Sequence, residues 1–177
     1  GVSLRRSAPS LLNVAYATSM FHDGRAKTLE DQALQPLLED DEMANPDIET
    51  VMHRINAMKE YHEPYKKAFG NTRATPERTA RALAAYERTL IAANSPFDRW
   101  HYGKDANAMS ATARRGFVLF VKNGCASCHT MGEKNALFSD GQFHNTGVQA
   151  RTEALNKQSV TYTLVPGLQS TMDPETL

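Results

Sequence analysis

The chain has 177 residues, enough for one domain of ordinary size or for two small lobes that share a cofactor. Its 20 basic and 20 acidic residues cancel, so no broad positive field attracts nucleic acid or an anionic membrane surface. The apolar runs are too short to cross a bilayer. We therefore expect no nucleic-acid partner and no membrane span. The first residue is Gly1 and no signal peptide precedes it, which favours a trimmed chain or a fragment.

The first strongly periodic segment is residues 48–60, where Ile48, Val51 and Ile55 recur at helical spacing. Asp47 precedes it and can accept hydrogen bonds from the first free backbone N–H groups. The sequence predicts a helix here, followed by a short helix that contains Pro64 and that Gly70 ends.

A second helix is predicted from Thr75, as the N-cap, to about Asn94, with Pro76 at its first position. Its expected apolar side is Leu83, Tyr86, Leu90 and Ile91, with Ala80 and Ala84 allowing close approach of a neighbour.

A third helix is predicted to begin after Ser110 and to stop at Gly124. Between the helices we expect linkers, at 94–109 and over most of the chain after residue 130. Residues 159–165, "SVTYTLV", are the best strand candidate and a weak one. The pattern predicts a mostly α-helical protein with long loops.

Both cysteines lie in the stretch "GCASCHT", in which Cys125, Cys128 and His129 have C-x-x-C-H spacing. This is the attachment signature of c-type haem: one helical turn brings both sulfurs to the same side of a porphyrin, and the next imidazole binds the iron. The sequence therefore predicts one covalent haem c, with His129 as the proximal iron ligand.

Three other uses of these thiols stay open. A thioredoxin-like redox pair normally follows a strand, whereas a helix precedes this one. A structural zinc site needs two further ligands at suitable spacing. A disulfide is the third alternative, and it leaves His129 without a role.

Several stretches in one order resemble the di-haem cytochrome c peroxidases and their MauG-like relatives. They are "RSAPSLLNVAY", "FHDGRAKTLEDQALQP", "AYERTLIAANSPFDRW", "MSATARRGFVLFVKNGCASCH" and "FSDGQFHNTGV". The resemblance implies a cytochrome c-like helical fold. It also implies two domains: residues 1–95 as the rest of an N-terminal peroxidatic haem domain, and 96–177 as an incomplete C-terminal haem domain.

The resemblance also implies a distal pocket made by Gln32, Pro36 and Glu42. Glu42 would act as general acid–base: it would take a proton from one oxygen of peroxide and return it to the leaving oxygen. The alternative is that residues 39–42, "EDDE", are an ordinary solvated acidic run. The relatives attach the haem that Glu42 would serve upstream of the first of these stretches. We therefore expect either a fragment of a longer protein, with a second haem, or a shortened homologue.

Other family positions differ here. His22 stands where the relatives place a tryptophan between the haems, so it is a candidate inter-haem relay or simply a structural residue. Ser7 stands where they use an asparagine for calcium, which makes calcium a weak expectation because that ion needs six or more oxygens.

The second axial ligand of the haem iron is the least defined position. Met172 lies downstream at a separation that small cytochromes c use, which makes it a candidate ligand, although a tail methionine without a ligand role is the favoured interpretation. Trp100 and Tyr102 could line the haem edge where electrons arrive, or could serve packing alone.

Two classes of function follow from the resemblance. The first is a periplasmic enzyme that reduces hydrogen peroxide with electrons from a small cytochrome c or cupredoxin, through the haem on Cys125, Cys128 and His129. Its MauG-like variant oxidises a protein. The second is a mono-haem electron carrier without peroxidase activity. The periplasm is expected because covalent haem attachment of this kind is made outside the cytoplasm, and a homodimer stays open.

Overall fold

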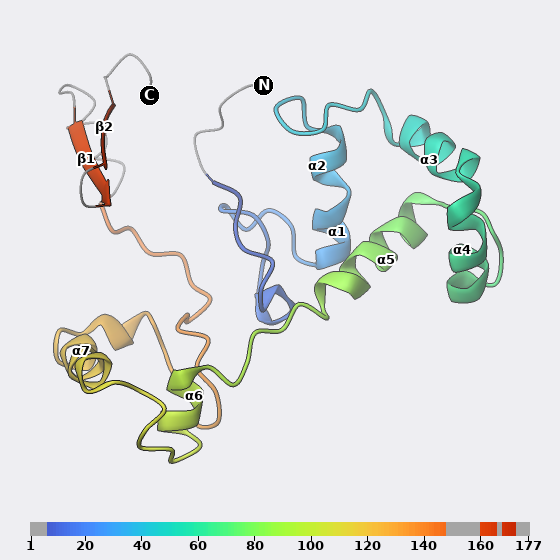
Figure 1. Ribbon diagram of the computed structural model, residues 1–177. Coiled ribbons are helices and arrows are strands. Elements are labelled where there is room, and N and C mark those ends of the chain that lie inside the picture. The colour runs from blue at the N-terminus through green and yellow to red at the C-terminus, as the bar shows by residue number, and fades with distance from the viewer. Residues whose placement is uncertain (1–6, 148–159, 166–167, 173–177) are drawn as a thin grey trace. The chain divides into compact units, whose positions relative to one another are not determined.

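The computed structural model describes residues 7–147, 160–165 and 168–172. The chain divides into two compact units, Gly1–Gly141 and Gln142–Leu177. The first unit is built from helices joined by long loops (Figure 1), which confirms the mostly α-helical prediction. The division into haem domains at residue 95 stays a prediction.

The helices and 3-10 turns of the first unit are η1 (Val14–Tyr16), α1 (Leu29–Ala33), α2 (Gln35–Leu38), α3 (Ile48–Ala57), η2 (Lys59–Tyr61), α4 (His62–Phe69), α5 (Pro76–Glu87), α6 (Pro96–His101), α7 (Ala111–Lys122) and η3 (Cys125–Ser127). None of the helices in the described residues is long and apolar enough to span a bilayer.

One small core joins α1 to α5. Leu29 of α1 packs with Ala84 of α5 and with Met20 and Ala26 from the preceding loop. Ala84 has no exposed surface, so the two helices approach closely at this alanine.

A second core lies within the α3–α5 segment. It contains Val51 and Met52 of α3, Tyr65 of α4 and Ala74 just before α5. The Tyr65 hydroxyl lies 2.8 Å from Thr79 Oγ1, so the polar ends of two buried side chains satisfy each other.

The predicted helix ends are mostly confirmed. Asp47 caps α3 by accepting from the Thr50 N–H at 2.6 Å, Thr75 caps α5, and Gly70 ends α4 at φ 82°. At the other end α3 stops at Ala57, because Met58 is extended and residues 59–61 form a 3-10 turn.

The prediction that the second helix runs to Asn94 is wrong, because α5 ends at Glu87. Asn13 explains the early end. Its N–H donates to the Leu90 carbonyl at 2.8 Å, and its side chain both accepts from the Ala92 N–H at 2.9 Å and donates to the Ala92 carbonyl at 3.1 Å. These three bonds engage backbone groups that a continuing helix would need.

For α5 the expected close approach at Ala80 and Ala84 is confirmed, whereas the expected apolar side is wrong. The buried residues of this helix are Thr79, Ala80 and Ala84, whereas Leu83 is 38% and Tyr86 63% exposed. Small residues form the buried face because α1 and α4 lie against it, and large side chains would hold those elements away.

A short helix interrupts the expected linker at 94–109. Helix α6 begins after Ser95, whose hydroxyl accepts from the Asp98 N–H while the Asp98 carboxylate accepts from the Ser95 N–H. This capping box, with Pro96 at the first position, is a sequence signal that could have predicted the helix. Helix α7 follows, capped by Ser110 as predicted.

The described part of the second unit includes two antiparallel strands, β1 (Val160–Val165) and β2 (Leu168–Met172). Val160 lies opposite Met172 in their register. The strand predicted at 159–165 is therefore confirmed from residue 160, whereas its partner was not predicted.

Candidate functional site: a haem-attachment motif and a distal segment

The C-x-x-C-H motif follows α7 directly. Gly124 adopts a left-handed conformation at φ 76° and ends the helix as predicted, and Cys125 opens the 3-10 turn η3. The His129 N–H donates to the Cys125 carbonyl at 3.0 Å, so the motif closes into one compact turn. Both cysteines are free thiols, Cys125 exposed and Cys128 half-buried. The turn thus presents two thiols and an imidazole from neighbouring positions.

The orientation of His129 is set by a backbone group. Its Nδ1 lies 2.9 Å from the Phe138 carbonyl oxygen. A carbonyl oxygen only accepts, so Nδ1 carries a proton, and in the neutral ring Nε2 then keeps its lone pair. A second bond, from the Thr130 hydroxyl to the Ser139 carbonyl at 2.8 Å, holds the same two segments together. An imidazole fixed in this tautomer is prepared to bind a metal through Nε2.

Aromatic rings from three segments pack together next to this turn. We call them the aromatic cluster: Phe97, Trp100, His101, Tyr102, Phe117, Phe120 and Phe138. Phe120 connects the cluster to the motif, with its ring centroid 6.1 Å from that of His129. The cluster members are at best half-buried, and no residue in the described stretch 85–147 is buried. The rings of the cluster therefore keep part of their apolar surface in contact with solvent.

These residues fit a c-type haem. The group needs two thiols on one side, a neutral imidazole with its lone pair available, and an apolar wall for the porphyrin. The motif turn supplies the thiols and His129, and the half-exposed rings supply the wall. Cys125 and Cys128 would hold the porphyrin, and His129 would bind its iron.

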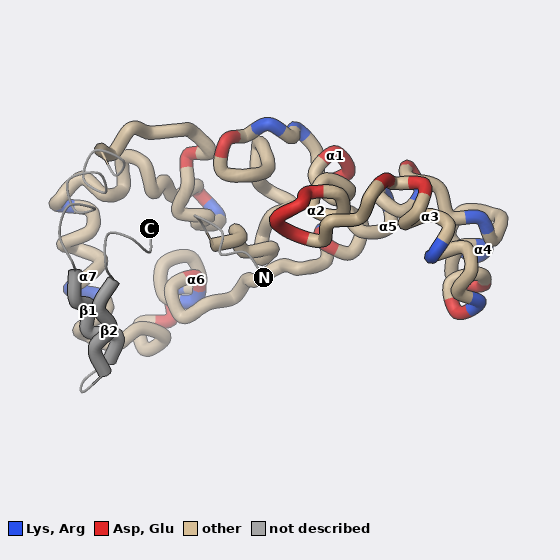
Figure 2. The backbone as a smooth tube through the Cα atoms, turned by 90° about the horizontal axis from the view of Figure 1, so that it is seen from above, with Lys and Arg blue, Asp and Glu red and all other residues tan. Residues whose placement is uncertain are grey.

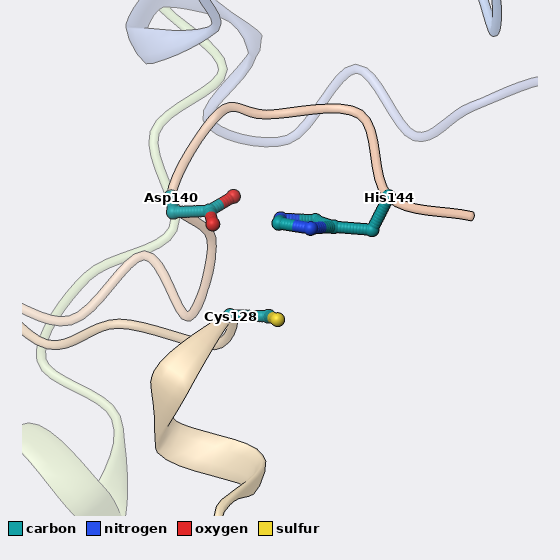
Figure 3. A group of neighbouring side chains, drawn as sticks. All are labelled: Cys128, Asp140 and His144. Carbon is teal, nitrogen blue, oxygen red and sulfur yellow. The ribbon is translucent and has the colours of Figure 1, made fainter. Parts of the chain in front are cut away.

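A zinc site explains the arrangement less well. Cys128 Sγ and an Asp140 carboxylate oxygen lie within 4.8 Å of each other, and Figure 3 shows both side chains reaching to the same side of the motif turn. His144, also labelled in Figure 3, belongs to the second unit. Within the first unit this is one thiol and one carboxylate, whereas structural zinc takes four ligands.

The three residues expected in the distal pocket lie in consecutive elements. Gln32 is half-buried in α1, which Thr28 caps by accepting from the Asp31 N–H at 3.1 Å. Pro36 is in the first turn of α2. Glu42 is exposed in the turn after α2, within the acidic run that Figure 2 shows in red beside that helix.

A set of backbone bonds folds this acidic turn onto α2. The Met43 N–H donates to the Pro36 carbonyl at 3.2 Å, and the Asn45 side chain donates to the Leu37 carbonyl at 2.7 Å. Arg54 of α3 in turn donates to Asn45 Oδ1 at 2.7 Å. The structure therefore places the neighbour of Glu42 directly against Pro36. Gln32 belongs to the preceding helix, and no direct contact joins it to Glu42 among the described bonds.

His22 lies exposed in a tight loop that the bond from the Met20 N–H to the Ala26 carbonyl closes at 2.8 Å. His22 Nε2 lies 3.0 Å from the Ser7 carbonyl and must donate to it. The nitrogen that would most readily bind iron therefore carries a proton.

Met172, the candidate distal ligand, is the last residue of β2, and its side chain lies outside the described part of the structure. Its role as a ligand stays a prediction.

Sequence reasoning missed Phe97 and Phe138. Phe97 is the centre of the aromatic cluster, with five ring neighbours that include His101 stacked at 5.1 Å. Phe138 contributes both its ring and the carbonyl that orients His129. No pattern in a sequence marks a backbone carbonyl as a histidine partner, so the second role could not have been predicted.

The fold and the motif together define a class of protein: a helical protein built to carry c-type haem. The family described as di-haem cytochrome c peroxidase matches residues 1–106. The chain belongs to the di-haem cytochrome c peroxidase family.

Individual relatives agree with this family. The chain is 41% identical over 151 residues to the methylamine utilization protein MauG of Methylorubrum extorquens, covering 84% of this chain and 41% of that protein. It is 38% identical over 123 residues to the cytochrome c551 peroxidase of Nitrosomonas europaea, covering 70% of this chain and 36% of that protein.

Among solved structures, the chain is similar to the diheme peroxidase BthA of Burkholderia thailandensis, with a TM-score of 0.66 and 29% identity. The match covers 77% of this chain and 39% of that one. The chain thus spans about two fifths of the length of these relatives.

Proposed function

We propose that this chain is the part of a di-haem peroxidase that carries the electron-transfer haem on Cys125, Cys128 and His129, together with the distal segment of the peroxidatic haem. The observation that carries the proposal is the bond from His129 Nδ1 to the Phe138 carbonyl at 2.9 Å, which prepares Nε2 of a C-x-x-C-H histidine for iron. On this proposal residues 1–95 belong to the first haem domain and 96–177 to the second.

The haem irons supply one-electron redox chemistry when bound. The proposed reaction takes hydrogen peroxide, two electrons and two protons to two water molecules. The residues of this chain would manage protons and position the substrate. Glu42 would take a proton from one peroxide oxygen and deliver it to the leaving oxygen, while Gln32 and Pro36 would shape the pocket.

The folding of the acidic turn supports this role for Glu42. The bond from the Met43 N–H to the Pro36 carbonyl and the Asn45 and Arg54 contacts hold the turn in one place. A carboxylate on a fixed turn can be presented to a substrate, whereas one in an ordinary solvated run has no defined position. Asp41 precedes Glu42 in the same turn and provides a matched control.

The test uses the intact, haem-loaded protein with hydrogen peroxide and a reduced small cytochrome c. Glu42→Gln removes the proton-accepting group and keeps the side-chain size, so we expect kcat/KM for peroxide to fall about 10²–10⁴-fold. Asp41→Asn should leave it unchanged. Equal activity in wild type and Glu42→Gln would overturn the assignment of Glu42.

His22 has a proposed place between the two haems. Its bond to the Ser7 carbonyl favours a structural role over iron ligation, because the Nε2 proton is engaged. Calcium stays outside the proposal, since the described residues offer only the Ser7 family position for an ion that takes six or more oxygens.

The electron donor is proposed to be a small cytochrome c or a cupredoxin, and the compartment the periplasm. The haem irons of such an enzyme exchange single electrons with a soluble redox protein. Cell fractionation that recovers the intact protein with cytoplasmic markers would contradict the compartment.

Protein oxidation is the second candidate function. The 41% identity to a methylamine utilization protein MauG favours it. The two functions differ in what supplies the electrons: a small redox donor for the peroxidase, and a protein side chain for the MauG-like reaction. Peroxide consumption that requires the reduced cytochrome supports the first. Covalent change in a protein substrate without that donor supports the second.

A further inference from the structure

The aromatic cluster contains an uninterrupted set of ring contacts from Trp100 to His129. One route passes from Trp100 to Phe117 with centroids 5.4 Å apart, then to Phe120 at 6.4 Å, and on to His129 at 6.1 Å. The contacts are those of packed aromatic pairs.

A second route leaves Trp100 through Phe97, with centroids 5.9 Å apart. It continues to Phe138 at 5.0 Å and to Phe120 at 5.9 Å. Both routes end at the imidazole that would bind the iron. Trp100 is thus joined to His129 through packed rings by two paths that meet at Phe120 and share the last step to His129. Electronic coupling through packed groups is stronger than through water.

Only two rings of the cluster are readily oxidised by one electron, Trp100 and Tyr102. Phenylalanine has no electron-rich heteroatom, and the imidazole of His101 is much harder to oxidise than an indole or a phenol. Tyr102 is poorly placed to lose an electron. Its hydroxyl donates to the Gly132 carbonyl at 3.0 Å, and a carbonyl does not take the proton that a phenol releases on oxidation. Burial, with a smaller contribution from the charge of Asp98, raises the Tyr102 pKa, which also opposes that release.

Trp100 has neither restriction. An indole can give up an electron before its N–H proton leaves, so oxidation does not require a base in contact. The side chain is half-buried, so part of it also meets solvent that can take the proton afterwards. The ring contacts to Phe97 and Phe117 hold it edge-on in the cluster.

We propose that Trp100 is a redox-active residue that gives one electron to the oxidised haem on Cys125 and Cys128 when no external donor is available. The inference rests on the proposed function, since hydrogen peroxide is the oxidant that creates the oxidised haem. One electron passes from the indole to the haem, the haem is reduced by one electron, and the N–H proton goes to solvent. A neutral indolyl radical remains until a reductant returns the electron and water the proton.

The test is freeze-quench electron paramagnetic resonance of the intact, haem-loaded protein mixed with hydrogen peroxide in the absence of a donor. Wild type should give a tryptophan radical, and peptide mapping after longer exposure should find oxygen added at Trp100. Trp100→Phe should lose the radical and keep the haem absorbance and the circular dichroism. Tyr102→Phe, the matched control in the same cluster, should keep the radical.

Two results would overturn the inference: a radical that persists in Trp100→Phe, or one that disappears in Tyr102→Phe. Failure of the proposed function gives a different result, because peroxide then leaves the haem absorbance unchanged. A parallel sample therefore receives hexachloroiridate(IV), a one-electron oxidant that needs no peroxide chemistry. Under that oxidant a radical at Trp100 in wild type, lost in Trp100→Phe, supports the inference, and oxidation confined to other residues contradicts it.

Discussion

Two regions of the first unit are stabilised in different ways. Between residues 20 and 84 the chain buries its own core, with ten hydrophobic side chains such as Met52 and Ala84 almost fully covered. Between residues 96 and 141 it gathers seven rings around a C-x-x-C-H turn and buries none of them. The first region stabilises itself through protein contacts, and the second through rings that need a further apolar group.

This difference shows which part of the fold a prosthetic group would stabilise. Burial of apolar area contributes roughly 25 cal/mol per Å², and half-exposed rings gain only part of it. A group stabilises the folded state when it interacts better with the folded than with the unfolded chain, and a covalently held porphyrin cannot diffuse away. We therefore expect haem to be a folding requirement for residues 96–141 and a minor contributor for α3–α5.

The largest expected effect comes from removing the haem. The double variant Cys125→Ser, Cys128→Ser should lose hydrogen-exchange protection of the α7 amides by ~10⁴-fold or more, about 5.5 kcal/mol, because the ring cluster stays only half-buried. The α3 and α5 amides should keep theirs. Ser127→Ala keeps both thiols and serves as the control. Unchanged α7 protection in the double variant would remove the distinction between the two regions.

The next effect tests the self-contained core. Met52→Ala removes a side chain that is 7% exposed and leaves a cavity, so we expect a loss of about 2–5 kcal/mol in the free energy of unfolding. Met58→Ala, just after the same helix, removes a methionine that is 42% exposed and should cost no more than about 0.5 kcal/mol. Urea denaturation followed by circular dichroism measures both. Similar losses would mean that burial does not distinguish these methionines.

A smaller effect tests the connection between the regions. Asn13→Ala removes two side-chain hydrogen bonds to Ala92, about 1 kcal/mol each, and puts alanine at φ 61°, which costs a further ~1 kcal/mol. Asn13→Gly loses the bonds without the conformational cost, so it should be about 1 kcal/mol less destabilised. Hydrogen exchange at the Ala92 amide should speed up in both. If the alanine and glycine variants lose the same free energy of unfolding, the left-handed conformation does not destabilise alanine at this position.

The smallest effects concern two carboxyls on either side of Arg88, with opposite dependence on pH. The bidentate hydrogen bonds from Arg88 lower the Glu30 pKa, whereas burial raises the Glu87 pKa, and Glu87 Oε2 has no hydrogen-bond partner in the described structure. A carboxyl whose pKa is lowered in the folded state stabilises the fold at pH values above its ordinary pKa. This stabilisation is lost as pH falls through the folded-state pKa. A carboxyl whose pKa is raised in the folded state stabilises the fold at pH values below its ordinary pKa. That stabilisation is lost as pH rises through the folded-state pKa.

Glu30→Gln should therefore reduce stability at neutral pH by less than about 1 kcal/mol, because the pair is partly exposed, and the loss should vanish in acid. Glu87→Gln should increase stability at neutral pH, and the gain should disappear as pH falls below the ordinary carboxyl pKa of 4.5. Thermal unfolding over a series of pH values measures both variants. Curves that shift in the same direction would contradict the assignment of opposite pKa changes.

The sequence was sufficient wherever the relevant chemistry is local. Asp47, Thr75 and Ser110 cap their helices through bonds to residues three positions later. Gly124 ends α7 through its own left-handed backbone, and the C-x-x-C-H spacing is a local signal as well. These predictions needed no knowledge of the rest of the fold.

The sequence was insufficient for features that depend on contacts between segments far apart in the chain. Helix α5 ends early because Asn13, far away in the chain, binds the backbone at Leu90 and Ala92. Its expected apolar side is wrong, with Leu83 and Tyr86 exposed, because the neighbouring elements lie against the side that carries Thr79, Ala80 and Ala84. The His129 tautomer depends on the carbonyl of Phe138. Each of these features depends on a contact between distant segments, and a single sequence carries no direct signal for such a contact.

The most direct test of the central claim is a measurement of covalent haem on the intact protein. Intact mass spectrometry after denaturation, combined with a pyridine haemochrome assay, should find one haem bound to the peptide that contains Cys125 and Cys128. That peptide should keep its Soret absorbance through denaturation, and the double serine variant should lose it. A peptide with the mass of its amino acids alone and no Soret absorbance would contradict the account.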